Sequence, residues 1–186
     1  MTQMPTLYLR PAAPDDVDTI FLWRRQTAAW LASRYGSDQW STPYPRERIE
    51  AWVADGATIM AALTPDGAPV ATITSTPDGD PALWTPDELA VPARYLAKAN
   101  VRPDHLGRGI GAVLIAWARA KAAEAGVALV RLDVWSTNER LQDYYRHLGF
   151  TYLRTVPGTV SGALFEGPAL SVADLPVIET KAALLG

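Results

Sequence analysis

The chain has 186 residues, of which 48% are hydrophobic and 20% charged, with a formal net charge of −3 and no cysteine. This usage is that of an ordinary globular domain over residues 1–186, which excludes disordered and fibrous proteins and gives no basic face for nucleic acid. Without thiols, and with only two histidines, no metal site is expected. With no bilayer-spanning run or signal-peptide pattern, we expect a cytoplasmic protein that binds no membrane.

The first half of the chain predicts helices and a hairpin. Apolar residues at helical spacing, interrupted by Arg24, predict a helix that ends near Tyr35, before Gly36. The Pro65-Asp66-Gly67 turn joins two predicted strands. The expected order is a strand at 7–10, the helix to about 35, a helix opening at Pro45, strands at 57–63 and 69–74, and a proline-rich loop at 76–92.

The second half contains one clear strand–helix–strand unit. Ile110, Val113, Leu114 and Trp117 follow helical spacing in the longest of its helices. The expected elements are a strand at 95–101, a helix at 109–125, a strand at 127–135, a helix at 138–148, and strands at 150–156 and 163–166. One such unit flanked by hairpin-like strands predicts a mixed α/β sheet rather than repeated βαβ winding.

The most informative segment runs from Val101 to Ala112, where three alternating glycines lead from a strand into a helix. Glycine permits positive φ and has no Cβ to obstruct a ligand. The first amides of a helix have no internal partner, so this turn suits a phosphate or pyrophosphate. A tight turn that binds nothing explains the glycines alone equally well.

Two other nucleotide motifs are weaker matches. Gly107, Gly109 and Ala112 fit the dinucleotide pattern G-x-G-x-x-A, but five residues, including Pro103, separate the first glycine from its strand. The Lys-Ser/Thr ending of a P-loop is absent. A nicotinamide-dependent oxidoreductase therefore stays a minor alternative.

The run Val-x-Pro-x-x-x-Gly-x-Gly-Ile-Gly, beginning at Val101, resembles the acyl-CoA motif of the GCN5-related N-acetyltransferase (GNAT) superfamily. The resemblance continues through Asn138, Tyr145 and Gly149-Phe150, and its specific part covers residues 95–150. It implies an α/β fold with a mixed, mostly antiparallel central sheet and flanking helices. It also implies acetyl-CoA as co-substrate and an amine as acceptor.

The resemblance assigns a set of residues to the cofactor. The pyrophosphate is expected on the glycine turn, and the pantetheine arm along the end of the strand before it, where that strand splays from the next one. The residues implied are Ala99, Asn100, Val101, Leu106, Gly107, Arg108, Gly109, Ile110, Gly111, Ala112 and Asn138. The family usually has Arg or Gln where this chain has Leu106, so one phosphate contact is lost. Asn138 is also a natural N-cap of its own helix.

For catalysis, the resemblance places Tyr145 near the thioester sulfur as general acid, because a phenol is protonated at neutral pH. The strand before the glycine turn lacks the glutamate that many relatives use as a base. Asp133 occupies the position of an acid in some relatives, and Asp87, Glu88 or a water chain are further candidates for the base. By the residues alone, Tyr145 on the apolar stripe of its helix favours a core side chain, and Asp133 favours a pair with Arg131 or Arg140.

Trp40, Tyr44 and Trp84 lie in predicted loops. They are either core residues or part of the lining of a substrate pocket. His105 and His147 are read as a solvent-facing turn residue and a helix-end residue.

The interpretation is a direct transfer of acetyl from acetyl-CoA to an amine in a ternary complex. A polyamine-like compound, an antibiotic, an amino acid and a protein N-terminus are all open as acceptors. Many relatives pair as homodimers, and the oligomeric state is open. The same residues also allow a non-catalytic acyl-CoA sensor or a protein-interaction module.

Overall fold

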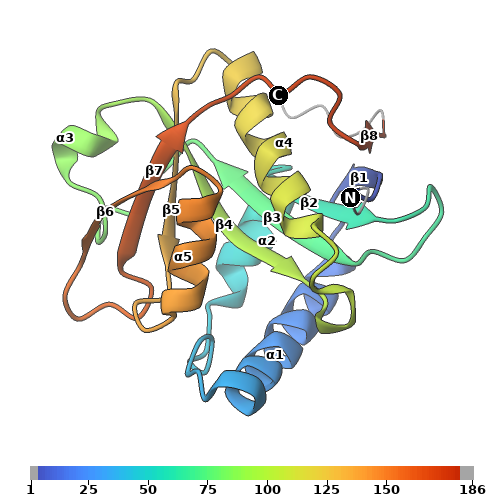
Figure 1. Ribbon diagram of the computed structural model, residues 1–186, viewed down its shortest axis with the longest axis horizontal. Coiled ribbons are helices and arrows are strands. Elements are labelled where there is room, and N and C mark those ends of the chain that lie inside the picture. Colours follow the sequence, from blue (N-terminus) through green and yellow to red (C-terminus); the bar gives the residue numbers. More distant parts are fainter. Residues whose placement is uncertain (1–3, 181–186) are drawn as a thin grey trace. The chain divides into compact units, whose positions relative to one another are not determined.

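A computed structural model describes residues 4–180 of the chain (Figure 1). The described residues form two compact units. The first comprises 4–74, 98–117 and 174–180, and the second comprises 75–97 and 118–173. Strand β4 (Ala93–Val101) and helix α4 (Ile110–Glu124) each run from one unit into the other.

The first unit contains an antiparallel meander of strands and two helices. Its elements are β1 (Leu7–Pro11), α1 (Asp16–Tyr35), α2 (Arg46–Ala54), β2 (Thr58–Ala62), most of β3 (Ala71–Thr76), the 3₁₀ turn η1 (Pro103–His105) and β8 (Val177–Glu179). β1 pairs antiparallel with β2, and β2 with β3. The short strand β8 pairs in parallel with β1, from Leu7↔Val177 to Leu9↔Glu179. The sequence did not predict β8.

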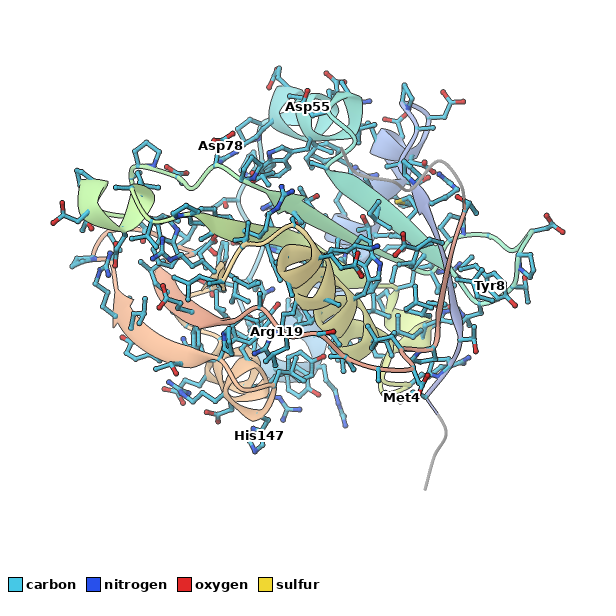
Figure 2. The ribbon with its side chains drawn as sticks, turned by 90° about the horizontal axis from the view of Figure 1, so that it is seen from above. Met4, Tyr8, Asp55, Asp78, Arg119 and His147 are labelled. Carbon is cyan, nitrogen blue, oxygen red and sulfur yellow. The ribbon has the colours of Figure 1, made fainter. Side chains whose placement is uncertain are left out.

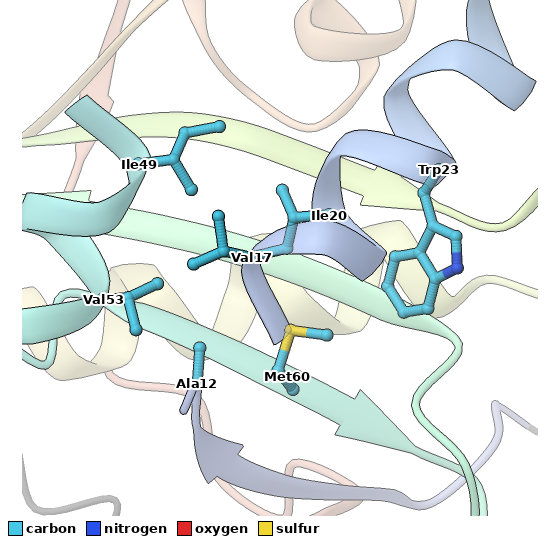
Figure 3. Close-up of a cluster of buried hydrophobic side chains, with 7 residues drawn as sticks. All are labelled: Ala12, Val17, Ile20, Trp23, Ile49, Val53 and Met60. Carbon is cyan, nitrogen blue, oxygen red and sulfur yellow. The ribbon is translucent and has the colours of Figure 1, made fainter. Parts of the chain in front are cut away.

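A hydrophobic cluster between helices α1 and α2 and the strands holds the first unit together (Figure 3). Its members are Ala12, Val17, Ile20, Trp23, Ile49, Val53 and Met60. Val17, Ile20 and Trp23 recur at three-residue spacing, so one face of α1 supplies them. Burying a side chain of this size contributes roughly 1.5–3 kcal/mol. The face of α1 that points into this unit is thereby fixed.

Both ends of α1 have local causes. The Asp16 carboxylate accepts the Ala13 amide at 2.7 Å and both Nη groups of Arg10 at 2.6 and 2.9 Å. At the other end Gly36 takes a left-handed φ of 63°, and its amide donates to the Ala32 carbonyl at 2.9 Å. The predicted stop at Gly36 is confirmed.

The second unit joins parallel and antiparallel strands. Its elements are the short helix α3 (Pro86–Leu89), the first half of β4, the end of α4, β5 (Leu129–Val134), α5 (Glu139–His147), β6 (Thr151–Thr155) and β7 (Ala163–Pro168). β4 pairs in parallel with β5 from Ala93↔Leu129 to Leu96↔Leu132. β7 pairs antiparallel with β5 and with β6.

The hydrogen-bonded order of the strands is β6-β7-β5-β4-β3-β2-β1-β8. The predicted mixed α/β sheet is confirmed, and the predicted strands and helices agree with the observed bounds to within two residues. Helix α3 forms inside the predicted proline-rich loop, where Thr85 and Glu88 make a reciprocal capping box.

Candidate functional site

The glycine turn connects β4 to α4 in the first unit. Gly107 and Gly109 have φ values of 77° and 78°, a left-handed backbone that side chains disfavour. A Cβ at Gly107 would meet nothing within 4 Å, so the conformation, and not crowding, requires glycine. Residues 106–109 are all exposed. The turn therefore presents its main chain to the surroundings.

The amides of this turn are available to a ligand. Within residues 4–180, the main-chain N–H groups of 107–112 have no hydrogen-bond acceptor, whereas the Val113 amide donates to the Gly109 carbonyl at 3.1 Å. Unpaired amides at the start of a 15-residue helix, together with its dipole, attract an anion. The turn has the chemistry of a phosphate site.

Side chains at and just before η1 contact one another where the chain enters the turn. Arg102 Nη2 donates to the Asp104 carboxylate at 2.7 Å, and His105 Nδ1 lies 2.9 Å from the same group. The hydrogen bond with His105, with help from Arg102, lowers the pKa of Asp104. His105 is half-buried and acts as a brace of the turn, so it is less exposed than predicted. Arg108 and Leu106 are exposed at the rim.

The end of β4 precedes this turn. Lys98 has a φ of 51°, which interrupts the regular strand and changes which residues are buried. Ala93 and Tyr95 are buried before it, and Asn100 after it. Asn100 Oδ1 accepts a hydrogen bond from Thr27 Oγ1 of α1 at 3.0 Å. The predicted cofactor contacts of Ala99, Asn100 and Val101 stay predictions.

Tyr145 lies on the buried face of α5 in the second unit and is 9% exposed. Its ring centroid lies 5.9 Å from that of Phe150 and 6.3 Å from that of Phe165. Burial raises the pKa of the Tyr145 phenol, and Tyr144 and Asp133 raise it further. The hydroxyl is therefore protonated at neutral pH, as a proton donor must be. A core tyrosine has the same surroundings, so the geometry is compatible with both predicted roles.

Asp133 and Asn138 belong to the same unit as Tyr145. Asp133 Oδ2 accepts a hydrogen bond from Ser161 Oγ at 2.6 Å, and its charge acts on the Tyr145 phenol. The two predicted catalytic side chains are thus electrostatically coupled. Asn138 Oδ1 accepts the Leu141 amide at 3.0 Å, which confirms the predicted N-cap. Asn138 precedes α5 as its N-cap, and Tyr145 lies seven positions further on, within the helix.

Glu88, a further candidate for the base, forms an ion pair. Its two carboxylate oxygens accept from Arg154 Nη1 and Nη2 at 2.6 and 2.7 Å. This hydrogen bonding, supported by Thr85, lowers the pKa of Glu88 to about 2. A carboxylate that holds a proton so weakly is a poor base for an ammonium group. Asp87, in the same short helix, is exposed.

The pocket hypothesis for Trp84 is wrong. Trp84 is 3% exposed and packs edge-to-face on Tyr95, with 5.6 Å between ring centroids. The proline-rich loop places this tryptophan in the core because burying its large apolar ring is favourable. His147 lies at the end of α5, as predicted, and is exposed there (Figure 2); its Nδ1 lies 2.7 Å from the Asp143 carbonyl.

Trp40 and Tyr44 do lie in a loop, and they flank a buried arginine that the sequence did not single out as a site residue. The Arg24 guanidinium carbon lies 6.0 Å from the centroid of the Trp40 ring and 5.8 Å from that of Tyr44. The only signal in the sequence was the interruption of the apolar stripe at this position.

Within residues 4–180, no group of three or more His, Asp or Glu side chains is placed to hold a metal ion. None of the helices in that part of the chain is both long and apolar enough to cross a membrane.

Comparison with known families identifies the family of the chain. The sequence model of the Acetyltransferase (GNAT) family matches residues 24–150, which is more than half of the chain. The chain belongs to the GNAT family of acetyltransferases. This GNAT match begins at Arg24 within α1, includes the glycine turn, and ends at Phe150 after α5.

Individual GNAT proteins are also similar to this chain in sequence or in structure. An uncharacterized N-acetyltransferase of Bacillus subtilis (strain 168), YesJ, is 27% identical over 150 residues, which cover 78% of this chain and 82% of YesJ. A GNAT-family acetyltransferase structure from Listeria monocytogenes 4b F2365 has a TM-score of 0.72 at 26% identity, covering 87% of this chain and 94% of that one. The PaiA N-acetyltransferase of Thermoplasma acidophilum, solved with coenzyme A, has a TM-score of 0.66 at 17% identity, covering 87% and 98%. The last likeness concerns the fold alone.

Proposed function

We propose that this GNAT protein transfers the acetyl group of acetyl-CoA directly to an amine. The observation that carries the proposal is the turn at the start of α4, in a chain that matches the family model: its residues 107–109 are exposed, and the amides of 107–112 have no acceptor within residues 4–180. The first amides of any helix lack internal partners, so the amides alone also fit a turn that binds nothing. The match to the family model is what favours a cofactor at this turn.

The residues of the turn fit the phosphates of the cofactor. The amides of 107–112 supply the hydrogen bonds, and glycine at 107 and 109 keeps side chains away from them. Arg108 adds an exposed cation at the rim, while Leu106 adds none. A solved relative of the same fold, PaiA, holds coenzyme A. The edge of β4 at 99–101 would pair with the pantetheine arm as an added strand does.

Acetyl-CoA supplies an activated carbonyl: the amine nitrogen bonds to its carbon, the carbon–sulfur bond breaks, and the thiolate leaves. We assign Tyr145 as the donor to that thiolate, because burial keeps its hydroxyl protonated. A thiol is ordinarily the stronger acid, with a pKa near ~8.5 against ~10 for a phenol. The main effect of Tyr145 is therefore a hydrogen bond to the developing negative charge.

The proton lost by the ammonium group needs an acceptor. Asp133 is our candidate, because Glu88 is committed to Arg154 and its pKa is lowered to about 2. Asp133 accepts from Ser161 and carries its charge beside Tyr145. Asp133 acts directly or through a water.

Two measurements test the proposal together. Native mass spectrometry of the purified protein, with and without CoA, shows whether one CoA is retained per subunit and how many subunits assemble. Release of free thiol from acetyl-CoA over a panel of primary amines then measures transfer. We expect retained CoA and amine-dependent release. Retained CoA without release for any amine would identify an acyl-CoA sensor, and no retained CoA would contradict the assignment of the turn.

A further inference from the structure

The first unit contains a buried cation without a counter-charge. Arg24, on α1, is 8% exposed, and no carboxylate within residues 4–180 pairs with it. Its Nη2 donates to the Thr42 carbonyl at 2.7 Å, but its Nε is buried and has no hydrogen-bond partner. A buried, unsatisfied N–H on a charged group is costly, so it needs an explanation.

Other buried arginines of the chain show what a structural role looks like. Arg131, 3% exposed, pairs with Glu166 at 2.7 Å and also donates to Tyr95 and to a carbonyl. Arg119, 6% exposed, donates to the carbonyls of Pro168 and Leu148 at 2.8 and 2.7 Å. Neither has an orphaned nitrogen. Arg24 differs from both in its orphaned Nε, so packing alone does not explain it. Burial lowers its pKa, as it also does for Arg119.

The surroundings of Arg24 add positive charge and aromatic surface. Trp40 and Tyr44 lie 6.0 and 5.8 Å from its guanidinium carbon. Lys98 Nζ, from β4, lies 3.6 Å from the centroid of the Tyr44 ring. Two cations thus approach one ring. The Arg24 guanidinium, which has no carboxylate partner in the described chain, attracts an anion rather than a polyamine.

The loop over Arg24 is strained. Trp40 has a φ of 61°, a left-handed conformation that costs a bulky residue roughly 1–3 kcal/mol. Residues held in such conformations cluster at ligand clamps. The same loop provides Thr42, whose carbonyl is the one hydrogen-bond partner of Arg24 in the described chain. Because Nε is buried, a ligand would reach it only if this loop moved.

Arg24 also lies close, along α1, to the strand that we assign to the cofactor. Thr27, one turn further along the helix, donates to Asn100 of β4 at 3.0 Å. Helix α1 also contacts η1, which opens the glycine turn. All of these residues belong to the first unit.

We propose that Arg24 binds a carboxylate of the acceptor, so that the acceptor is an amine that also carries a carboxylate, as amino acids do. This inference rests on the proposed function. The Nε and Nη groups of a guanidinium form a planar fork that matches the two oxygens of a carboxylate. Trp40 and Tyr44 pack against the apolar part of the acceptor.

The test compares matched acceptors. Amino acids and their primary amides offer the same side chain and an α-amine, with and without the negative charge. We expect the wild-type kcat/KM, from thiol release, to be at least about tenfold higher for the best acid than for its amide, as one charged hydrogen bond implies. Equal values, or a preference for the amides across the panel, would overturn the proposal.

Variants of α1 assign the effect to Arg24. Arg24→Gln is expected to lose at least about tenfold on the acid and less than about threefold on the amide. Because the acid-to-amide ratio is compared between variants, the different basicities of the two amines cancel. Arg25→Gln, an exposed neighbour with the same change in charge, should leave the ratio unchanged. Equal losses of Arg24→Gln on both acceptors would make Arg24 structural.

Two further measurements keep the outcomes distinct. If Arg24→Gln does not fold, as judged by circular dichroism, Arg24→Lys takes its place, and it should keep the charge but lose most of the preference. Titration of the CoA-loaded wild type with an acid and its amide, followed by calorimetry, needs no turnover. Tighter binding of the acid there supports the inference even if transfer fails, whereas thiol release without a preference overturns the inference and leaves the proposed function standing.

Discussion

At the residue scale, burial of Tyr145 has two effects: it packs the ring in the core and it keeps the hydroxyl protonated. The ring packs between Phe150 and Phe165, while desolvation keeps the hydroxyl protonated. We expect Tyr145→Phe to lower kcat about 10- to 100-fold, since a hydrogen bond to a charged group is lost, with the affinity for CoA changed less than about twofold. Steady-state kinetics and calorimetry check this. Tyr144→Phe, on the 38% exposed neighbour, is the control. An unchanged kcat in Tyr145→Phe would return this residue to the core alone.

Asp133 is tested by removing its charge and its hydrogen bond separately. Asp133→Asn removes the charge, and we expect kcat/KM at neutral pH to fall about 100-fold, the usual effect of a lost base. The loss should shrink as the pH rises, because the amine then deprotonates without help. Ser161→Ala keeps the carboxylate but removes its 2.6 Å donor, so it should cost little activity. Equal losses in both variants, at every pH, would show that the pair is structural.

At the element scale, matched substitutions at the two ends of α4 test whether its start, and not its end, binds CoA. Gly109 has a φ of 78° before the helix, and Gly126 has a φ of 72° after it. Valine at either position imposes similar backbone strain, roughly 1–2 kcal/mol. We expect Gly109→Val to abolish CoA binding in calorimetry, because its side chain would cover the amides, while Gly126→Val binds normally. Retained binding in Gly109→Val would move the phosphates elsewhere.

Helix α3 and strand β6 are joined by the Glu88–Arg154 ion pair, which should make stability depend on pH. The folded-state pKa of Glu88 is lowered from 4.5 to about 2, first through its hydrogen bond with Arg154. Folding therefore favours the ionised form. Its contribution is complete above about pH 4.5 and is lost as the pH falls through about 2.

Glu88→Gln removes the charge but keeps a side chain that can complete the capping box. We expect it to lower the free energy of unfolding by about 1 kcal/mol at pH 7, after allowing for solvent screening, and by less at pH 3. Urea titrations at the two pH values measure this. Asp87→Asn, on the exposed residue beside it, should change neither value. A loss that is the same at pH 7 and pH 3 would mean that the carboxylate charge does not stabilise the fold.

At the scale of the whole molecule, local signals were sufficient for most elements and for part of the site. Neighbouring residues alone predict the periodicity of α4, the stop at Gly36 and the cap at Asn138, and the structure confirms all three. Strand β8 was missed because three residues give no periodic signal, and only the distant partner β1 makes them a strand.

Pairings between distant residues explain the other omissions. Glu88 meets Arg154 across 66 positions of sequence, so its lowered pKa is invisible to any reading of the loop alone. Trp84 is a loop residue by sequence and a core residue by packing, because Tyr95 and Leu164 close around it. Arg24 interrupted the apolar stripe of α1, but only the fold shows that the interruption is buried and lacks a partner.

The absence of cysteine in the whole chain has a kinetic consequence. Without a thiol to carry the acetyl group, we expect transfer within a ternary complex, so initial-rate lines at several fixed acceptor concentrations should intersect. Thiol release with varied acetyl-CoA measures this. Parallel lines would indicate an acetylated enzyme. Intact-mass measurement after incubation with acetyl-CoA alone should then show a stable acetyl adduct on a serine or threonine, beyond that found on heat-unfolded protein, and the two results together would contradict direct transfer.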